Sequence, residues 1–255
     1  DPNDKAPALT PTRRRFVALL LAAAPFAANA APGDGTWDWM VAPYVWAASV
    51  GTDIRTSTPP SNASNDLNFD DVLEKLDGVA EVHAEGQGDA FGVLFDATYF
   101  GLADEDDHRF LPTESDLDLR LFELAAVWSP GTERFTGLET FAGVRVIDVD
   151  TTIQFIPHNP VFTGGSRHIG ATFYDAMIGA RYTWKLSDRW SLTLRGVGSW
   201  GDTDGTWNAS LVGQYRMTRG AWVFGYRYFD VDLEDAGNTL SVSLDGPVIG
   251  YAFHF

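Results

Sequence analysis

The sequence predicts an all-β fold: an antiparallel β-barrel of about ten strands that crosses a membrane. First, residues 247–255 alternate large apolar residues with small or polar ones, a period of two that gives a strand one oily face. Second, the connections between the predicted strands alternate between long and short, as they do in membrane barrels. Third, tryptophans gather beside the short connections, where such barrels carry a girdle of aromatic residues.

The first thirty residues predict a cleavable signal peptide. A basic stretch at 13–15 precedes an apolar run at 16–26, and Ala28-Asn29-Ala30 supplies small residues for cleavage after Ala30. The apolar run is too short for a membrane-spanning helix, which needs about 20 residues. The expected organisation is therefore a signal peptide over 1–30 and a barrel over 31–255.

Composition excludes several classes of function. A formal net charge of −17 argues against nucleic acid as a partner, because phosphate binding needs clustered Lys and Arg. The chain has no cysteine, which excludes a disulfide scaffold, thiolate catalysis and thiolate metal sites. No apolar segment reaches 18 residues, so the sequence offers no candidate transmembrane helix.

Alternation and turn signals together predict ten strands. A slip of phase near Pro43 suggests a bulge or strand edge in the first of them, and residues 70–76 could form one or two helical turns. Long outward loops are expected at 51–77, 103–116 and 150–170, and short turns after the second, fourth, sixth and eighth strands. The predicted strands are 37–50, 79–85, 91–99, 117–128, 138–149, 173–184, 190–200, 206–217, 221–229 and 239–255.

The free-energy cost of placing a charge in lipid predicts which face of each strand points inward. A Lys or Arg that faces lipid at mid-bilayer costs about 2–4 kcal/mol, so charged residues must face the lumen and their neighbours the lipid. One strand resists this rule, because Asp118 and Arg120 lie on the opposite face from Glu123. We expect either a bulge there or a Glu123 close to the rim. The predicted lumen network comprises Glu81, His83, Glu85, Asp96, Arg145, Asp175, Arg181 and Arg227.

Two sequence themes carry a resemblance. The closing pattern Tyr251-x-Phe253-x-Phe255 resembles the C-terminal recognition strand of bacterial outer-membrane β-barrels. A Gly-x-Arg theme occurs at 143–145, 179–181 and 225–227, and with 187–192 and 246–250 it resembles a family of uncharacterised outer-membrane barrel proteins of Gram-negative bacteria. The resemblance implies a monomer in the outer membrane, in contact with lipid and lipopolysaccharide. It also implies that the barrel-assembly machinery reads Tyr251, Phe253 and Phe255.

Several functions remain open from the sequence. The lumen acids and arginines predict either a polar plug in a structural or surface-interaction barrel, or a narrow cation-preferring passive channel. A barrel hydrolase like the omptins is a third reading, but no spacing of His, Ser and acidic residues supports it. The sequence predicts no catalytic, cofactor or metal residues. The acidic runs at 104–107 and 230–235 lack the ligand spacing of a calcium loop and are read as solvated charge.

Overall fold

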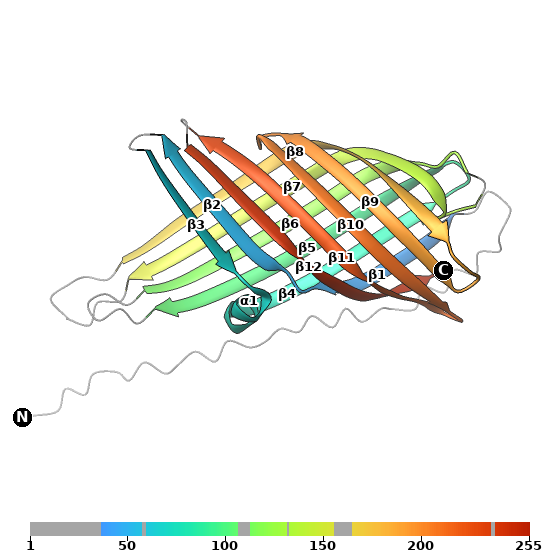
Figure 1. The fold of residues 1–255 in the computed structure, drawn as a ribbon, viewed down its shortest axis with the longest axis horizontal. Coiled ribbons are helices and arrows are strands. Elements are labelled where there is room, and N and C mark those ends of the chain that lie inside the picture. The colour runs from blue at the N-terminus through green and yellow to red at the C-terminus, as the bar shows by residue number, and fades with distance from the viewer. Residues whose placement is uncertain (1–36, 58–59, 107–112, 132, 156–164, 236–237) are drawn as a thin grey trace, which may run out of the picture.

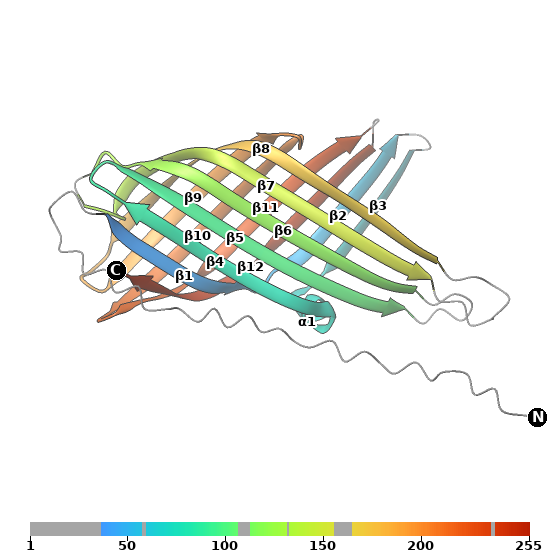
Figure 2. The same cartoon turned by 180° about the vertical axis from the view of Figure 1, so that it is seen from behind.

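A computed structural model describes residues 37–57, 60–106, 113–131, 133–155, 165–235 and 238–255. The predicted signal peptide lies outside these residues. The described chain is almost entirely antiparallel strand with one short helix (Figures 1 and 2). In chain order the elements are β1 (Asp38–Trp46), β2 (Ser49–Ser57), β3 (Pro60–Leu67), α1 (Phe69–Lys75), β4 (Leu76–Gln87), β5 (Phe91–Asp106), β6 (Thr113–Trp128), β7 (Gly137–Phe155), β8 (Gly165–Lys185), β9 (Trp190–Gly201), β10 (Gly205–Met217), β11 (Gly220–Asp235) and β12 (Asn238–His254).

The sheet closes on itself as a barrel with ten strand positions. β1 pairs with β4 on one edge and with β12 on the other, which joins the first strand to the last. β1 and β2 keep one register along β12, with gaps in the pairing at residues 42–43 and 47–48, and so occupy one position. β3 pairs with β2 and β4 pairs with β1, so these two share the next position. The predicted antiparallel barrel of about ten strands is confirmed.

The predicted long loops were wrong in extent. Residues 51–77 form most of the β2–β3 hairpin and α1, so only the expected helical turns there are confirmed. β5 and β6 continue to Asp106 and from Thr113, and β7 and β8 continue to Phe155 and from Gly165. The phase slip near Pro43 is not a bulge, because β1 keeps the same register with β12 before and after that residue. The β1–β4 ladder ends there at Pro43↔Val82, which agrees with the alternative of a strand edge. Backbone pairing persists where side-chain alternation fades, and alternation was the signal read from the sequence.

The barrel wall is split near the end where β5 connects to β6 and β7 connects to β8. We call this end the long-loop end. The outer part of β4 pairs with β5 only, and β3 pairs with β2 only, among the pairings of the described residues. α1 lies against β2, β3 and β5 at this split and buries Val72 there. The Asn68 side chain accepts a hydrogen bond from the Asp71 amide at 3.1 Å, and the Asp71 carboxylate accepts one from the Asn68 amide, which caps the helix.

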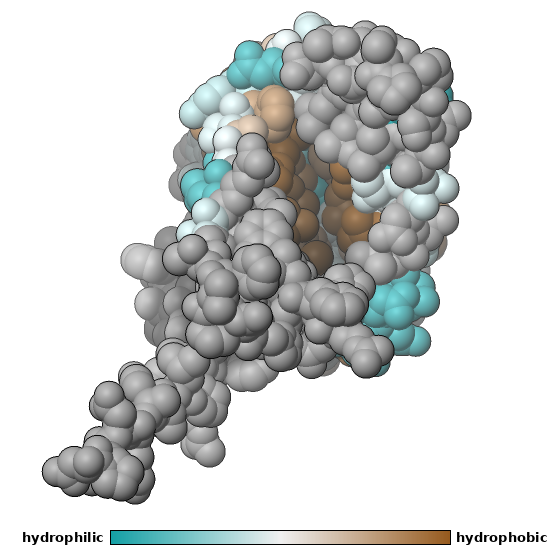
Figure 3. Space-filling view, turned by 90° about the vertical axis from the view of Figure 1, so that its left-hand side faces the viewer, coloured by the Kyte–Doolittle hydropathy of each residue, from teal (hydrophilic) through white to brown (hydrophobic). Residues whose placement is uncertain are grey.

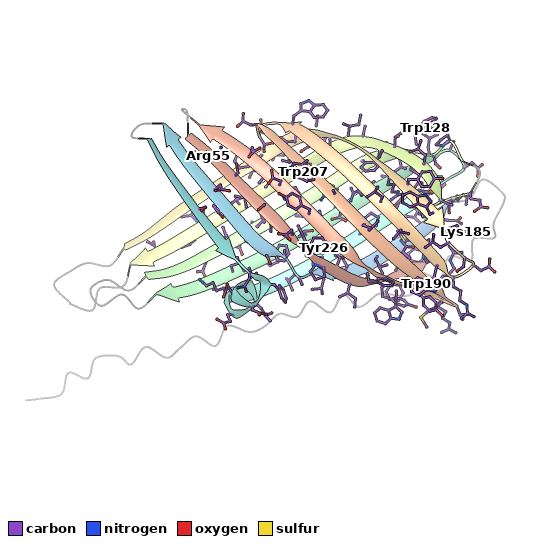
Figure 4. All side chains as sticks on the ribbon, viewed as in Figure 1. Arg55, Trp128, Lys185, Trp190, Trp207 and Tyr226 are labelled. Atoms are coloured by element: carbon purple, nitrogen blue, oxygen red, sulfur yellow. The ribbon has the colours of Figure 1, made fainter. Side chains whose placement is uncertain are left out.

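Aromatic residues mark two levels on the outside of the barrel. Trp128 and Trp190 lie at the end with the short turns, where the C-terminus is also found (Figure 4). Trp207 and Tyr226 lie farther along the wall, and all four side chains are 43–50% exposed. A tilted strand covers about 20 Å of height in eight residues. This height is close to that of the apolar band of a membrane barrel. Among the described residues no helix is long and apolar enough to span a bilayer.

The misfit on the fourth predicted strand has a different cause from the one expected. β6 keeps a continuous register with both neighbours, so there is no bulge, and Glu123 is fully buried in the interior instead of near the rim. Arg120 points outward, lies over the Tyr99 ring and donates to Asp148 at 2.7 Å. Hydrogen bonds from Thr172 and then Arg120 hold the pKa of the Asp148 carboxyl below its usual value. The wall therefore continues past the apolar band with a polar outer face.

Candidate functional site

The first cluster in the barrel interior centres on Arg181 of β8. Its guanidinium bridges Glu85 of β4 and Glu139 of β7, with 2.6 Å between Nε and the Glu139 carboxylate. Gln87 donates to both carboxylates, and its own carbonyl accepts the Phe135 amide at 2.6 Å. Both glutamates are fully buried. Because β4 and β8 are not neighbours in the sheet, these bonds cross the lumen.

The second cluster centres on Glu123 of β6. One carboxylate oxygen accepts Arg145 at 2.6 Å and the other accepts Arg195 at 2.6 Å, so one acid compensates the fully buried guanidinium of Arg145 and the partly buried one of Arg195. Arg145 also donates to Ser199 and to Thr206 on the far side of the barrel. Ser199 in turn donates to Asp175 at 2.8 Å. The second cluster thus links β6 and β7 to β8, β9 and β10.

The third cluster links β1, β4, β5 and β11. The Tyr44 hydroxyl donates to Asp96 at 2.8 Å and accepts Arg227 at 2.9 Å. Both ring nitrogens of His83 face carboxylates, Nδ1 at 3.1 Å from Asp96 and Nε2 at 3.3 Å from Glu85. The imidazole therefore connects the third cluster to the first. Together the three clusters form one charged layer across the barrel.

An apolar layer covers the charged layer toward the long-loop end. Its buried members come from β1, β5, β6, β7, β11 and β12 and form one cluster with Ala48: Trp46, Phe100, Leu121, Ile147, Phe229, Val231, Leu244 and Val248. Farther out, interior-facing apolar side chains remain only partly buried and so border open space: Val50, Leu119, Val149, Phe173 and Val242. Figure 3 looks into this end and shows hydrophobic residues lining a hollow. We call this hollow the outer chamber.

On the other side of the charged layer lies a cavity of about 280 Å³ in the short-turn half. Polar side chains line its mouth, among them Arg216, Gln214 and Lys185, and its inner end reaches Tyr44 and Arg227. The charged layer and the apolar layer therefore separate this cavity from the outer chamber.

The structure brings all eight predicted lumen residues into the interior. Six are buried, and the side chains of His83 and Arg181 are 16% and 10% exposed. The rule that charge faces inward also predicts Arg195 in the lumen, where it donates to Glu123. The sequence list omitted several other polar partners, namely Tyr44, Gln87, Glu123, Glu139, Ser199 and Thr206. Inward parity on each strand could have found most of them, because each lies an even number of residues from a listed or buried lumen residue.

The three aromatic residues predicted as an assembly signal, Tyr251, Phe253 and Phe255, lie at the outer face of the closing strand. Tyr251 packs edge-on against Phe253 with 4.9 Å between ring centroids, and Phe255 exchanges two backbone hydrogen bonds with Trp39 of the first strand. Among the described residues no group of three His, Cys, Asp or Glu side chains has the geometry to hold a metal ion.

Comparison with known proteins identifies the fold. No protein-family model and no curated protein matches this sequence. The structure is similar to the outer membrane protease OmpT from Escherichia coli, with a TM-score of 0.51 and 9% identity over 86% of this chain and 96% of that one. The fold is that of an outer-membrane β-barrel. Matches with lower scores include Ail of Yersinia pestis (TM-score 0.36, 7% identity, 85% and 99% covered) and OprG of Pseudomonas aeruginosa (0.30, 12%, 88% and 98%).

Proposed function

We propose that this protein is a sealed, non-enzymatic barrel of the Gram-negative outer membrane, with a structural or surface-interaction role. The observation that carries the proposal is the double layer inside the barrel. Arg181 and Arg145 reach across the lumen to strands that are not their neighbours. A buried apolar cluster then covers the charged layer. A ten-strand barrel is narrow, and side chains of this size fill its cross-section.

The outward-facing residues support a membrane location. Large apolar side chains such as Tyr174, Ile178 and Leu211 are 47–63% exposed on the wall, a cost in water that lipid would remove. The proposed partners are outer-membrane lipid and lipopolysaccharide, with the barrel-assembly machinery acting on the closing strand. The proposal takes the protein as a monomer without a cofactor.

Single-channel recording in planar bilayers tests the seal. Heat-modifiable migration on gels first shows that the purified protein is folded. The folded protein should then give no steady conductance in the bilayer. The competing function is a narrow cation-preferring channel. Steady cation-selective current that falls in Glu81→Gln or Glu85→Gln would establish the channel and overturn the sealed barrel.

A barrel hydrolase is the remaining alternative. Three histidines, His108, His158 and His168, were expected in outward loops. His108 and His158 lie outside the described residues, and His168 lies in β8 instead of a loop. His168 is 3.2 Å from Asp150, and its side chain is 64% exposed. An exposed ion pair of this kind is common on protein surfaces and does not by itself indicate catalysis. Cleavage of a peptide library that is lost in His168→Ala would contradict the non-enzymatic proposal.

A further inference from the structure

The cavity in the short-turn half has a polar wall whose side chains make few bonds within the protein. Ser210, Val212, Gln214 and Arg216 alternate along β10 and all line the cavity, so this strand turns one face toward it. Among the described residues, no hydrogen bond or ion pair engages the hydroxyl of Ser210, the amide of Gln214 or the guanidinium of Arg216. These groups are therefore free to bond a molecule in the cavity.

Arg195 of β9 completes this wall at the inner end, where it pairs with Ser210 across the two strands. Its Nη2 donates to Glu123 at 2.6 Å, and its Nε is enclosed without a partner. The remaining nitrogen, Nη1, has no partner among the described residues and is not enclosed. The guanidinium carbon lies 5.0 Å from the centre of the Phe141 ring, which fixes the plane of the group. A guanidinium N–H and a hydroxyl thus lie on adjacent strands at the cavity, and both can donate a hydrogen bond.

The charges around these two donors favour an anion. Arg195 shares its only bonded carboxylate, Glu123, with Arg145, so two guanidinium groups have one counter-charge between them. Glu85 and Asp96 also line the cavity, and Asp96 attracts Arg195. Both carboxylates, however, are already occupied by hydrogen-bond donors of the first and third clusters. Two adjacent donors beside an undercompensated arginine match the two oxygens of a carboxylate.

A second side of the cavity is apolar. Met40 and Ala42 of β1 belong to one apolar cluster with Phe135 and Val223, and all four line the cavity. The amide of Phe135 donates to the side-chain carbonyl of Gln87 at 2.6 Å, which anchors the connection between β6 and β7 at this side. An apolar cavity of about 150 Å³ accommodates benzene, so one of about 280 Å³ has room for a benzene ring and a short chain.

We propose that this cavity binds a small organic carboxylate with an apolar body, whose head group bonds Arg195 and Ser210. The molecule enters at the short-turn end, where Figure 4 labels Lys185 and Trp190 of the cavity lining. Short turns of outer-membrane barrels face the periplasm, so the molecule comes from that compartment. Arg216 at the mouth has no carboxylate partner among the described residues and attracts anions. The inference goes beyond the surface-interaction role, because it concerns the lumen on the other side of the charged layer.

Ligand-observed NMR tests the site with the full barrel in lipid nanodiscs and with empty nanodiscs as the blank. The probes are 3-phenylpropanoate, its uncharged isostere 3-phenylpropanamide, and acetate. We expect saturable binding of 3-phenylpropanoate with a Kd of about 1 mM or tighter. The amide and acetate should bind at least about tenfold more weakly, because one lacks the charge and the other lacks the apolar body.

Three variants of the lining locate the bound probe. Ser210→Ala removes a hydroxyl without a partner in the described chain, so it should leave folding unchanged and weaken binding about tenfold. Val212→Trp should abolish binding by filling the cavity. Arg195→Gln should weaken binding at least about tenfold. Because Arg195 also bonds Glu123, heat-modifiable migration must first show that this variant is folded, and Ser210→Ala decides the matter if it is not.

The cation at the mouth has a matched control. Arg216→Gln should weaken binding of 3-phenylpropanoate about fivefold at low salt and less at high salt, because salt screens the attraction. Arg219 lies in the adjacent turn and outside the cavity lining. Arg219→Gln should therefore leave the affinity within about 1.5-fold of wild type.

The outcomes separate this inference from the sealed barrel. Equal binding of the amide and the carboxylate would overturn recognition of the charged head. Unchanged binding in folded Ser210→Ala and Val212→Trp would place the probe elsewhere and overturn the site. No saturable binding of any probe, in a barrel that does not conduct, would overturn the inference while the sealed barrel stands. Steady conductance in a barrel that binds the carboxylate would overturn the sealed barrel and leave the site standing.

Discussion

At the scale of single residues, the interior is held by charges that depend on one another. Glu123 is fully buried and is the shared acceptor of Arg145 and Arg195. Moving three charges out of water is costly, and their mutual attraction offsets that cost only while all partners are present. The stability of this cluster is therefore sensitive to the loss of any one member.

The first prediction concerns that shared acceptor. Glu123→Gln removes the counter-charge of the buried Arg145 and of the partly buried Arg195, and it should lower the free energy of unfolding by about 3–5 kcal/mol. Urea titration of the barrel in lipid vesicles, followed by heat-modifiable migration, measures it. Glu133→Gln is the matched control, because Glu133 pairs with Lys185 at 3.5 Å on the surface and should change stability by less than about 0.5 kcal/mol. Equal stability of the two variants would contradict the role of Glu123.

The Gly-x-Arg theme also has a steric explanation. A Cβ atom at Gly143 would meet the carbonyl oxygen of Leu124, and one at Gly225 would meet that of Leu211. At Gly179 the space is taken by the Phe141 ring, on which Arg195 stacks at 5.0 Å. Each glycine thus leaves room for a backbone carbonyl or a ring of the neighbouring strand to lie where its Cβ atom would be. Each also lies two residues before an arginine that reaches into the lumen.

The second prediction tests this close approach. Gly143→Ala must push β6 away from β7 and should destabilise the barrel by about 1–3 kcal/mol, the usual cost of overpacking. Gly196→Ala is the control, since an added Cβ there has no atom of the described chain within 4 Å and should cost less than about 0.5 kcal/mol. The same vesicle unfolding assay compares them, and a Gly143→Ala barrel as stable as wild type would refute the steric account.

At the scale of elements, each long strand reverses its polarity along its length. On β6, Leu124 and Phe122 face outward in the apolar band, whereas Arg120 and Asp118 face outward beyond it and Leu119 faces inward. β11 behaves alike, with Phe224 outside in the band and Phe229 inside beyond it. The backbone register never shifts. The environment outside the barrel changes from lipid to water along the strand. Apolar side chains therefore face outward in the lipid band and inward beyond it.

The third prediction locates the boundary between the two environments. Ile178 and Thr172 face outward on β8, six residues apart on opposite sides of Tyr174. Ile178→Arg places a charge in the middle of the apolar band and should cost about 2–4 kcal/mol, whereas Thr172→Arg lies beyond the band and should cost less than about 1 kcal/mol. Unfolding in vesicles measures both. Equal penalties would show that the bilayer extends over Thr172.

At the scale of the whole molecule, closure joins segments from opposite ends of the chain. β1 and β12 pair from Met40↔His254 to Trp46↔Val248, and the ladder ends where Trp39 and Phe255 exchange backbone bonds of 2.8 and 3.0 Å. These contacts have the longest sequence separation in the fold and so the largest loop entropy to overcome. Closing the ring also removes the sheet edges along β1 and β12, whereas β3 and the outer part of β4 keep an edge at the split that is unpaired among the described residues.

The fourth prediction concerns this closing strand. Phe255→Ala should reduce the amount of folded protein in the outer membrane severalfold, because the aromatic side chain resembles the one that assembly machinery reads and lies at the last pair of the ladder. Phe253→Leu keeps an apolar side chain one pair inward and is the matched control, expected near wild-type level. Quantitative immunoblots of outer-membrane fractions measure both, and equal levels for Phe255→Ala and wild type would remove the support for the signal.

The sequence by itself determined the class of fold, the approximate number of strands and the inward side of most of them. A period of two and the cost of a charge in lipid are local properties, legible in segments such as 79–85 and 247–255. They also placed Glu85, Asp96 and Arg145 in the lumen before any contact was known.

Only the tertiary structure decided where the strands end, which side chains pair across the lumen, and which residues fill the barrel toward the long-loop end. Polarity reverses beyond the apolar band, so the rule that charged residues face inward failed for Asp118 and Arg120. Fading alternation hid the strands at 51–57 and 60–67. The link from Arg181 to Glu85 spans 96 residues of sequence and depends on the diameter and tilt of the closed ring.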